Sequence, residues 1–258
     1  MENLTKENSF KDKVVLVTGS SRGIGAAIAL NFANHGAKVV LHGRDEDALK
    51  KLQHVIAASG GDAMIAIADL NKFNEIEAMR EQVQKKLGEV DILIANAGGS
   101  FTPPAPLEEI PEDGWRASVD GNLTVTFLTL KSFLPAMKKR KSGHIITISS
   151  SAGRKPHAMA PIPYGAAKAA IIMLTQDIAA QVGPYGINVN CIAPETILTE
   201  RNMTRIPEEQ LKSMADFHPI KRLGTPADVA NAAIFLASEN AAWITGAVLD
   251  VAGGAVMV

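Results

Sequence analysis

A tyrosine and a lysine four residues apart, Tyr164 and Lys168, are the pair in this sequence best suited to proton transfer. If Tyr164 opens a helix, the two side chains lie one turn apart on the same face. A nearby ammonium group favours the tyrosinate and lowers a phenol pKa that is ordinarily about 10. Such a tyrosine can exchange protons near neutral pH. The spacing alone is also typical of a surface pair, so its meaning depends on the rest of the chain.

A glycine-rich turn at 18–25 is the second candidate site. The β-branched run 14–17 leads into Thr-Gly-Ser-Ser-Arg-Gly-Ile-Gly, with glycines at Gly19, Gly23 and Gly25. Glycines permit a tight turn and a close approach of the backbone to a phosphate, and a following helix directs its N–H groups at the anion. Between a strand and a helix, this turn predicts a dinucleotide site, with a plain tight turn as the alternative.

The end of the second strand indicates which dinucleotide is bound. An acidic residue there is typical of NAD-binding folds, whereas an arginine accommodates the 2′-phosphate of NADP. Here Gly43 is followed by Arg44, and Arg22 in the glycine turn adds a second cation. The forked donors of arginine suit phosphate. We therefore expect NADP(H) to be favoured over NAD(H), although both arginines could instead be solvated surface residues.

The elements that must position these residues alternate along the chain. Strands are predicted at 14–17, 37–41, 63–68, 92–95, 144–149, 188–192 and 247–251, and helices at 25–33, 45–58, 74–87, 115–139 with a break near Pro135, 164–182 and 227–237. This alternation predicts an α/β protein with a single Rossmann domain, a doubly wound parallel sheet of about seven strands with helices on both faces. Residues 1–12 are expected to form a polar N-terminal extension, and 13–258 the catalytic domain.

Three loop-like stretches, 98–113, 152–163 and 194–219, follow predicted strands. Ligands in open α/β sheets bind outside the carboxyl ends of the strands. We therefore expect these loops to form the walls of a substrate site. The third contains a helical piece at 207–217 and could act as a lid.

Composition and charge exclude several classes of protein. The 258 residues carry a formal net charge of −1 and are 47% hydrophobic, which is typical of a globular chain and lacks the basic footprint of a nucleic-acid-binding protein. No apolar run approaches the ~20 residues of a membrane helix. The polar segment 1–13 has no apolar core typical of a secretory signal, so a cytoplasmic location is expected. The sequence predicts neither a disulfide nor a metal site, because it has a single cysteine, Cys191, and six histidines without metal-ligand spacing.

Together with further motifs, these features resemble the short-chain dehydrogenase/reductase family, in particular its 3-oxoacyl-[acyl-carrier-protein] reductase-like members. The resemblance extends from about Lys13 to the C-terminus. Its motifs are the cofactor turn Thr18 to Gly25, the adenine-contacting acid in Asp69-Leu70, the strand end Asn96-Ala97-Gly98, the helix asparagine Asn122, the serine strand Ile148-Ser149-Ser150, and the pair Tyr164 and Lys168.

The resemblance implies a role for each motif residue. Tyr164 would be the general acid in carbonyl reduction and the base in alcohol oxidation, and Lys168 would lower its pKa and bind the nicotinamide ribose. Ser150 would hydrogen-bond the substrate oxygen, and Asn122 would hold a water in a proton relay. The nicotinamide supplies the hydride. The expected cofactor-binding residues are Gly19, Ser21, Arg22, Gly23, Ile24, Gly25, Arg44, Asp69, Leu70, Asn96, Ala97, Gly98, Tyr164, Lys168, Pro194, Ile197 and Thr199.

Two departures from the family pattern stand out. Tyr164 follows Ser150 by 14 positions, one more than is usual, so counting favours Ser151 as the catalytic serine whereas strand position favours Ser150, which we prefer. Glu195 follows Pro194 where the family usually has glycine. It either reshapes the substrate entrance or points to solvent, and we favour solvent. His157 lies in the second loop, where contact with substrate is the less favoured of its two interpretations.

We therefore expect an NADP(H)-dependent oxidoreductase that transfers hydride reversibly between the nicotinamide and a carbonyl or secondary alcohol. A 3-oxoacyl thioester is the leading substrate, and a sugar, polyol or other small ketone stays open. A non-catalytic NADP(H)-sensing regulator is the contrasting class, disfavoured because Ser150, Tyr164 and Lys168 are all present. The resemblance also suggests a homotetramer, with helices 115–139 and 164–182 pairing between subunits and the apolar tail 243–258 forming a second interface.

Overall fold

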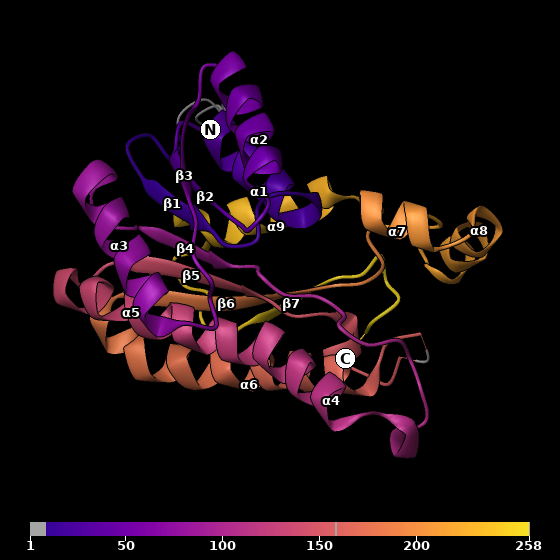
Figure 1. The fold of residues 1–258 in the computed structure, drawn as a ribbon. Helices are drawn as coiled ribbons and strands as arrows, with labels where there is room; N and C mark the ends of the chain where they lie inside the picture. The colour runs from indigo at the N-terminus through magenta and orange to yellow at the C-terminus, as the bar shows by residue number, and fades with distance from the viewer. Residues whose placement is uncertain (1–8, 158, 258) are drawn as a thin grey trace.

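The protein is described here by a computed structural model covering residues 9–157 and 159–257, and its centre is one parallel sheet (Figure 1). The strand order is β3-β2-β1-β4-β5-β6-β7, with every neighbouring pair parallel. The strands are β1 (Val14–Val17), β2 (Lys38–His42), β3 (Asp62–Ala66), β4 (Ile92–Ala95), β5 (Gly143–Ile148), β6 (Ile187–Pro194) and β7 (Val248–Val251). The order reverses between β1 and β4, which is where ligands bind in doubly wound folds.

Helices cover both faces of the sheet and leave two separate cores. One face carries α1 (Gly23–Asn34), α2 (Glu46–Ala58) and α9 (Pro226–Leu236), and the other carries α3 (Phe73–Leu87), α4 (Glu112–Val119), α5 (Val125–Arg140) and α6 (Ile162–Val182). Because both faces are covered, the central strands β1 and β4 are continuous, fully buried apolar runs. The expected α/β architecture is confirmed.

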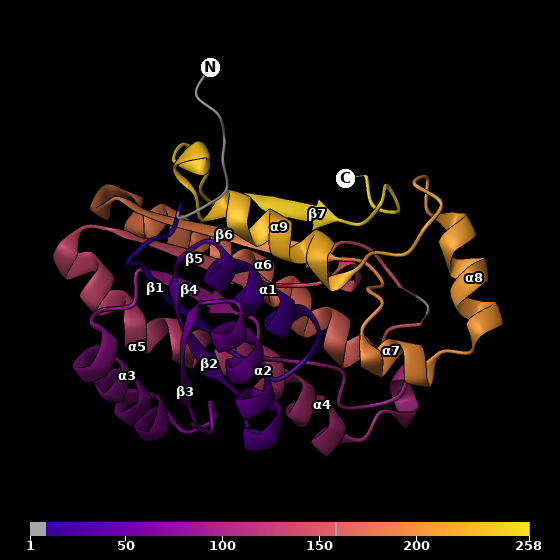
Figure 2. The same ribbon diagram turned by 90° about the horizontal axis from the view of Figure 1, so that it is seen from above.

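Two further helices, α7 (Glu200–Arg205) and α8 (Glu208–Phe217), lie beyond the carboxyl ends of the strands (Figure 2). The helix α8 was expected at 207–217, but α7 was not predicted because six residues are too few to show a helical period. Its start is nevertheless defined by Thr199, whose side chain accepts a hydrogen bond from the Asn202 N–H. The remaining short helices are η1 (Leu107–Glu109), η3 (Ser151–Gly153), η4 (Gly183–Tyr185) and η5 (Glu239–Ala241).

The expected break at Pro135 is wrong, because α5 continues through that proline. The interruption lies earlier, in a π-helical turn, η2 (Asp120–Thr124), that joins α4 to α5. Its cause is visible at Asn122, whose side-chain amide donates to the Ser118 carbonyl at 2.8 Å and so competes with the backbone for that acceptor. Single π turns inside helices occur frequently at functional sites.

The N-terminal segment joins the core earlier than expected. The ring of Phe10 is buried and packs edge-on against Phe32, with 5.0 Å between centroids, and its N–H donates to His35. Residues 1–8 of the expected extension lie outside the described residues. In the part of the chain that the structure describes, no helix is long and apolar enough to span a bilayer.

Candidate active site

A cleft of about 970 Å³ opens at the carboxyl ends of the strands, above the switch between β1 and β4. Every residue expected to bind the cofactor lines this cleft, as do Ser150, Tyr164 and Lys168. Asn122 lies just outside its wall. The structure therefore brings together motif residues that are spread over most of the chain.

The glycine turn fits a phosphate because its backbone has no room for side chains. Gly19 and Gly23 have positive φ values of 65° and 58°, and a Cβ on Gly25 would lie 2.4 Å from the Gly19 oxygen. The end of β4 fixes the turn, since the Asn96 side-chain amide donates to the carbonyls of Thr18 at 2.8 Å and Gly19 at 3.1 Å. This cradle suits the close approach of a dinucleotide.

His42 is a site residue that sequence reasoning missed. Its buried ring accepts the Gly19 N–H at Nδ1 (3.3 Å), and its Nε2 lies 3.0 Å from the Ala68 oxygen. These two bonds assign the neutral tautomer with hydrogen on Nε2. Burial lowers the pKa of His42, and the charge of Arg44 lowers it further. The only sequence signal was its place at the end of the second strand.

The two arginines expected at the 2′-phosphate differ in their surroundings. Arg22 Nη2 lies 2.9 Å from Asp45 Oδ2, and both side chains are substantially exposed. Asp45 also caps α2 by accepting the Ala48 N–H. Arg44 lies close enough to Asp69 to contribute to the lowered pKa of that carboxyl, whose main cause is the Asn71 N–H. Asp45 therefore places an acidic side chain near the end of β2, which the absence of an acid at Gly43 did not reveal.

Tyr164 and Lys168 lie on one face of α6, with Lys168 Nζ 5.7 Å from the tyrosine ring centroid. The ammonium is buried and donates to the Ile148 carbonyl at 2.8 Å. Burial lowers the pKa of Lys168 to about 8. The expected lowering of the Tyr164 pKa is wrong, because burial raises it, and the Ser150 hydroxyl and the Arg201 charge only partly oppose that rise.

Asn122 packs directly behind this pair. Its Oδ1 accepts the Gly99 N–H at 3.0 Å, and its Nδ2 donates to the Gly99 carbonyl at 2.9 Å. Gly98 lies between Asn122 and Lys168 and must be glycine, since a Cβ there would lie 2.6 Å from Asn122 Oδ1 and 3.4 Å from Lys168 Nζ. The π turn thus uses the asparagine side chain to hold the backbone that follows β4.

The two candidate serines face different partners. The Ser150 hydroxyl interacts with Tyr164 and lowers its pKa, and it also accepts the Ala152 N–H at 3.2 Å. Ser151 is buried and contributes instead to the low pKa of Glu195. Of the two serines, Ser150 is therefore the one that faces Tyr164.

Glu195 does not point to solvent, so the favoured interpretation of this residue is wrong. Its side chain is 8% exposed, and Oε1 lies 3.1 Å from His157 Nε2 and 3.2 Å from the Thr196 amide nitrogen. Burial acts to raise the pKa of Glu195, but hydrogen bonds from His157 and Ser151 outweigh it and lower the pKa to about 2. The same contact raises the pKa of His157. The pair therefore joins the loops after β5 and β6 at the substrate side of the cleft.

The segment after Glu195 crosses the cleft. A Cβ on Gly23 would lie 3.2 Å from Thr199 Cγ2, so the start of α7 packs against the glycine turn. Arg201 Nη2 donates to the Ser100 carbonyl at 3.0 Å. Ile197 and Thr199 line the same cleft as the glycine turn. Within residues 9–157 and 159–257, no cluster of three or more His, Cys, Asp or Glu side chains could hold a metal ion.

Comparisons with known proteins agree with this geometry. A family model described as enoyl-(acyl carrier protein) reductase matches residues 19–256. The 3-oxoacyl-[acyl-carrier-protein] reductase FabG of Salmonella typhimurium is 38% identical over 97% of this chain and 100% of its own. The 7alpha-hydroxysteroid dehydrogenase of Escherichia coli is 37% identical over 95% of this chain and 94% of its own. A crystal structure of a 3-oxoacyl-[acyl-carrier protein] reductase with bound NAD from Brucella melitensis superimposes with a TM-score of 0.90 at 33% identity, covering 100% of this chain and 96% of that one.

Proposed function

The chain belongs to the short-chain dehydrogenase/reductase family, whose members are NAD(P)-dependent oxidoreductases of CH–OH and C=O groups, and we propose that it favours NADP(H) and acts through Ser150, Tyr164, Lys168 and Asn122. The observation that carries this proposal is the convergence of Ser150, Tyr164 and Lys168 at one end of a cleft whose other end is the glycine turn. A cofactor phosphate at the turn and a reacting carbonyl at the tyrosine fit the two ends of one cleft.

The residues present fit a dinucleotide. The glycine turn would hold its phosphates, and Asp69 and Leu70 would border its adenine, as they line the same cleft. When bound, the nicotinamide supplies or accepts the hydride. Lys168 also lines the cleft, with its Nζ beside Gly98, and its ammonium would contact the ribose hydroxyls.

Tyr164 and Ser150 would bind the carbonyl oxygen and handle the proton. Burial raises the pKa of Tyr164, so the phenol is protonated at neutral pH and is suited to act as the acid in carbonyl reduction. The Ser150 hydroxyl donates to the oxygen as negative charge develops there. The pKa of Lys168 is about 8, so its ammonium is charged at neutral pH and stabilises the tyrosinate left after proton transfer. Asn122 supports this end of the cleft through Gly99 and would hold the relay water behind the lysine.

The preference for NADP(H) is supported by Arg44 and by Gly43, which leaves no carboxylate at the strand end itself. The Arg22–Asp45 ion pair weakens the contribution of Arg22, because part of its charge is already neutralised. The preference therefore depends mainly on Arg44.

A 3-oxoacyl thioester is the substrate we propose, on the similarity to FabG. A different small ketone is the alternative, because the steroid dehydrogenase is almost equally similar and because the half-buried His157–Glu195 pair adds polar groups to the substrate side. We also propose a homotetramer. Exposed apolar side chains support it on the helices α4 to α6 and on the tail, namely Trp115, Phe127, Ile162, Met173, Trp243 and Met257.

The test begins with fluorescence titration of the purified protein by NADPH and NADH. The protein is then assayed for NADPH oxidation with acetoacetyl thioesters and a panel of small ketones. We expect tighter binding of NADPH and thioester turnover that is lost in Tyr164→Phe. Tyr185→Phe is the matched control, since Tyr185 stacks under Lys138 on the opposite side of the fold and should keep full activity. Tight cofactor binding without turnover of any ketone would leave the sensing regulator as the better description.

A further inference from the structure

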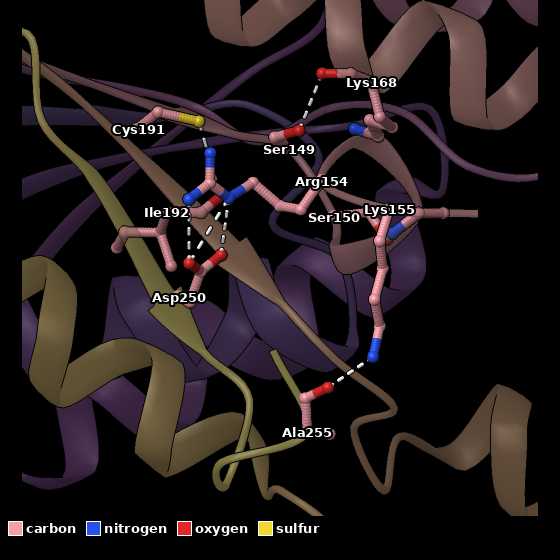
Figure 3. A network of polar contacts seen from close by, with 10 residues as sticks. Ser149, Ser150, Arg154, Lys155, Lys168, Cys191, Ile192, Asp250 and Ala255 are labelled. Carbon is pink, nitrogen blue, oxygen red and sulfur yellow. Dashed lines mark hydrogen bonds and ion pairs between the residues drawn. The ribbon is translucent and has the colours of Figure 1, made fainter. Parts of the chain in front are cut away.

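The turn that carries Ser150 is tied to the edge strand β7 by an ion pair between Arg154 and Asp250. Arg154 Nε lies 2.9 Å from Oδ1 and Nη2 lies 3.1 Å from Oδ2, with side chains 20% and 16% exposed. Figure 3 shows the guanidinium reaching from the turn to the strand β7, which carries Asp250. A forked, sheltered contact of this kind fixes the orientation of the guanidinium as well as its position.

The turn η3 is pressed against α6 on its other side. A Cβ on Gly153 would lie 2.7 Å from the Lys168 carbonyl carbon and 2.8 Å from the Ala169 nitrogen. Gly165 makes the reciprocal approach, since its Cβ would lie 3.0 Å from the Ala152 oxygen. The turn therefore packs on the α6 backbone at the level of Tyr164 and Lys168, and any outward shift would leave a gap there.

Short hydrogen bonds between backbone groups connect Arg154 to Ser150. The Gly153 N–H donates to the Ser150 carbonyl, and the Arg154 N–H donates to the Ser151 carbonyl, each at 2.9 Å. The Ser150 hydroxyl accepts the Ala152 N–H. A displacement of Arg154 would thus be transmitted to the Ser150 hydroxyl through a single tight turn.

The carboxylate end of this connection is also well fixed. Asp250 pairs with Ala193 in the register of β6 and β7, and the Glu195 N–H donates to the Val251 carbonyl next to it. Lys155, directly after Arg154, adds a second tie through its ammonium to the Ala255 carbonyl. The end of β7 is therefore a rigid anchor for the turn.

We propose that Asp250 is a positioning residue that acts through Arg154 to hold the Ser150 hydroxyl at its distance from Tyr164. The proposal rests on the proposed function, in which Ser150 touches the reacting oxygen. The loop between Ser150 and Tyr164 is one residue longer than is usual in the family, and the longer loop does not itself hold the serine in place. An anchor outside α6 keeps Ser150 in position and so accounts for the longer loop.

The first test measures kcat and KM for carbonyl reduction in Asp250→Asn and Arg154→Gln, each made in the wild type and in Ser150→Ala. Misplacing a reacting group by a fraction of an ångström to one ångström is expected to lower kcat by about 10-fold to 100-fold. The KM for the cofactor should stay within about twofold, because the glycine turn lies at the other end of the cleft. In the Ser150→Ala background neither substitution should lower kcat further, since the effects of substituting residues that act through one another are not additive.

Arg222 and Asp228 provide a matched control pair. They form a similar forked contact, with Nη1 2.7 Å from Oδ2 and Nη2 2.8 Å from Oδ1, at the start of α9 and outside the cleft. Asp228→Asn should lower the melting temperature while leaving kcat within about twofold of the wild type. Arg154→Lys keeps the charge and loses the fork, so it should recover part of the kcat lost in Arg154→Gln.

A second measurement does not need activity. Hydrogen exchange of the Gly153 and Arg154 amides should be faster in Asp250→Asn than in the wild type, and unchanged in Asp228→Asn. An unaltered exchange rate would overturn the proposal. Where Ser150→Ala lowers kcat, an unaltered kcat in Asp250→Asn, or an equal loss of kcat in the Ser150→Ala background, would also overturn it. If Ser150→Ala itself leaves kcat unchanged while the exchange rates respond as expected, the proposed role of Ser150 fails and the anchoring of the turn by Asp250 stands.

Discussion

The imidazole of His42 and the backbone N–H of Gly19 are joined by a 3.3 Å hydrogen bond that ties the end of β2 to the glycine turn. The bond requires an unprotonated Nδ1, because the ring accepts the hydrogen. On the other side of the ring, Nε2 donates to the Ala68 carbonyl, next to Asp69, where we propose that the adenine binds. One neutral side chain therefore connects three segments that line the cleft.

Acid should weaken cofactor binding through His42. Burial lowers the pKa of this histidine from its ordinary 6.5, so the unfolded chain takes up a proton near 6.5 and the folded protein only at lower pH. The contribution of the neutral His42 to the free energy of unfolding is therefore complete above pH 6.5. It is lost as the pH falls from 6.5 to the pKa of His42 in the folded protein. The Kd for NADPH depends on the folded protein, so we expect it to rise as the pH falls through the lowered pKa of the folded His42. It should rise less in His42→Asn, whose amide oxygen replaces Nδ1 without titrating. Titrations of both proteins between pH 5 and pH 8 check this, and parallel curves would contradict it.

Lys168→Met should produce a protein that is more stable and inactive. The pKa of the buried ammonium is about 8, against an ordinary 10.5. Below pH 8 the buried charge therefore lowers the free energy of unfolding by its full cost, and this cost disappears as the pH rises to 10.5. The variant should gain about 1–3 kcal/mol in the free energy of unfolding at pH 7. Urea unfolding of both proteins without cofactor, at pH 7 and at pH 10, measures the gain and its disappearance. A less stable variant at pH 7 would show that the bond to Ile148 outweighs the cost of burial.

Asp45→Asn should strengthen the preference for NADPH. The substitution removes the charge that pairs with Arg22 at 2.9 Å and keeps a side chain able to cap α2. The released guanidinium can then contribute to binding the 2′-phosphate, so the Kd for NADPH should fall about threefold to tenfold while that for NADH changes little. Arg44→Gln should act in the opposite direction. Equal effects on the two cofactors would place Arg22 and Asp45 away from the 2′-phosphate.

Glu195→Gln should lower the pKa of His157. The Glu195 carboxylate raises the pKa of His157 above 6.5 in the wild type, so the stability that the protonated imidazole adds is present below 6.5 and is lost as the pH rises through the folded pKa. NMR titration of histidine-labelled protein follows the His157 ring directly. We expect its pKa to decrease in the variant, with His54 as the exposed reference. Unchanged titration would mean that the pair at 3.1 Å does not persist in solution.

The predicted site residues that the structure brings together in the cleft share a local signal. Gly19, Gly23 and Gly25 lie between a short apolar strand and a helix, and Tyr164 and Lys168 are spaced by one helical turn. Patterns of this kind depend on neighbouring residues only, so the strand order was not needed to interpret them. The same holds for the seven strands, whose apolar runs were visible before their pairing was known.

The features that sequence analysis missed or predicted wrongly concern residues whose surroundings are set by distant parts of the chain. Arg154 and Asp250 are 96 positions apart and meet because β6 and β7 pair in one particular register. Glu195 was expected to face solvent because nothing in its neighbourhood indicated His157. The pKa of Tyr164 was expected to fall because the lysine was visible in the sequence and the burial of the ring was not.

The place of Asp250 on β7 has a consequence for the order in which the protein is made. A chain emerging from the ribosome exposes its residues from the N-terminus, and segments fold as they become available. The glycine turn, β1 and β4 emerge long before β7, and Asp250 emerges after every other residue assigned to the site. A chain interrupted before β7 would therefore present its cofactor cradle and its tyrosine while its serine turn still lacked an anchor. Reactivity, on this account, is the last property that the growing chain acquires.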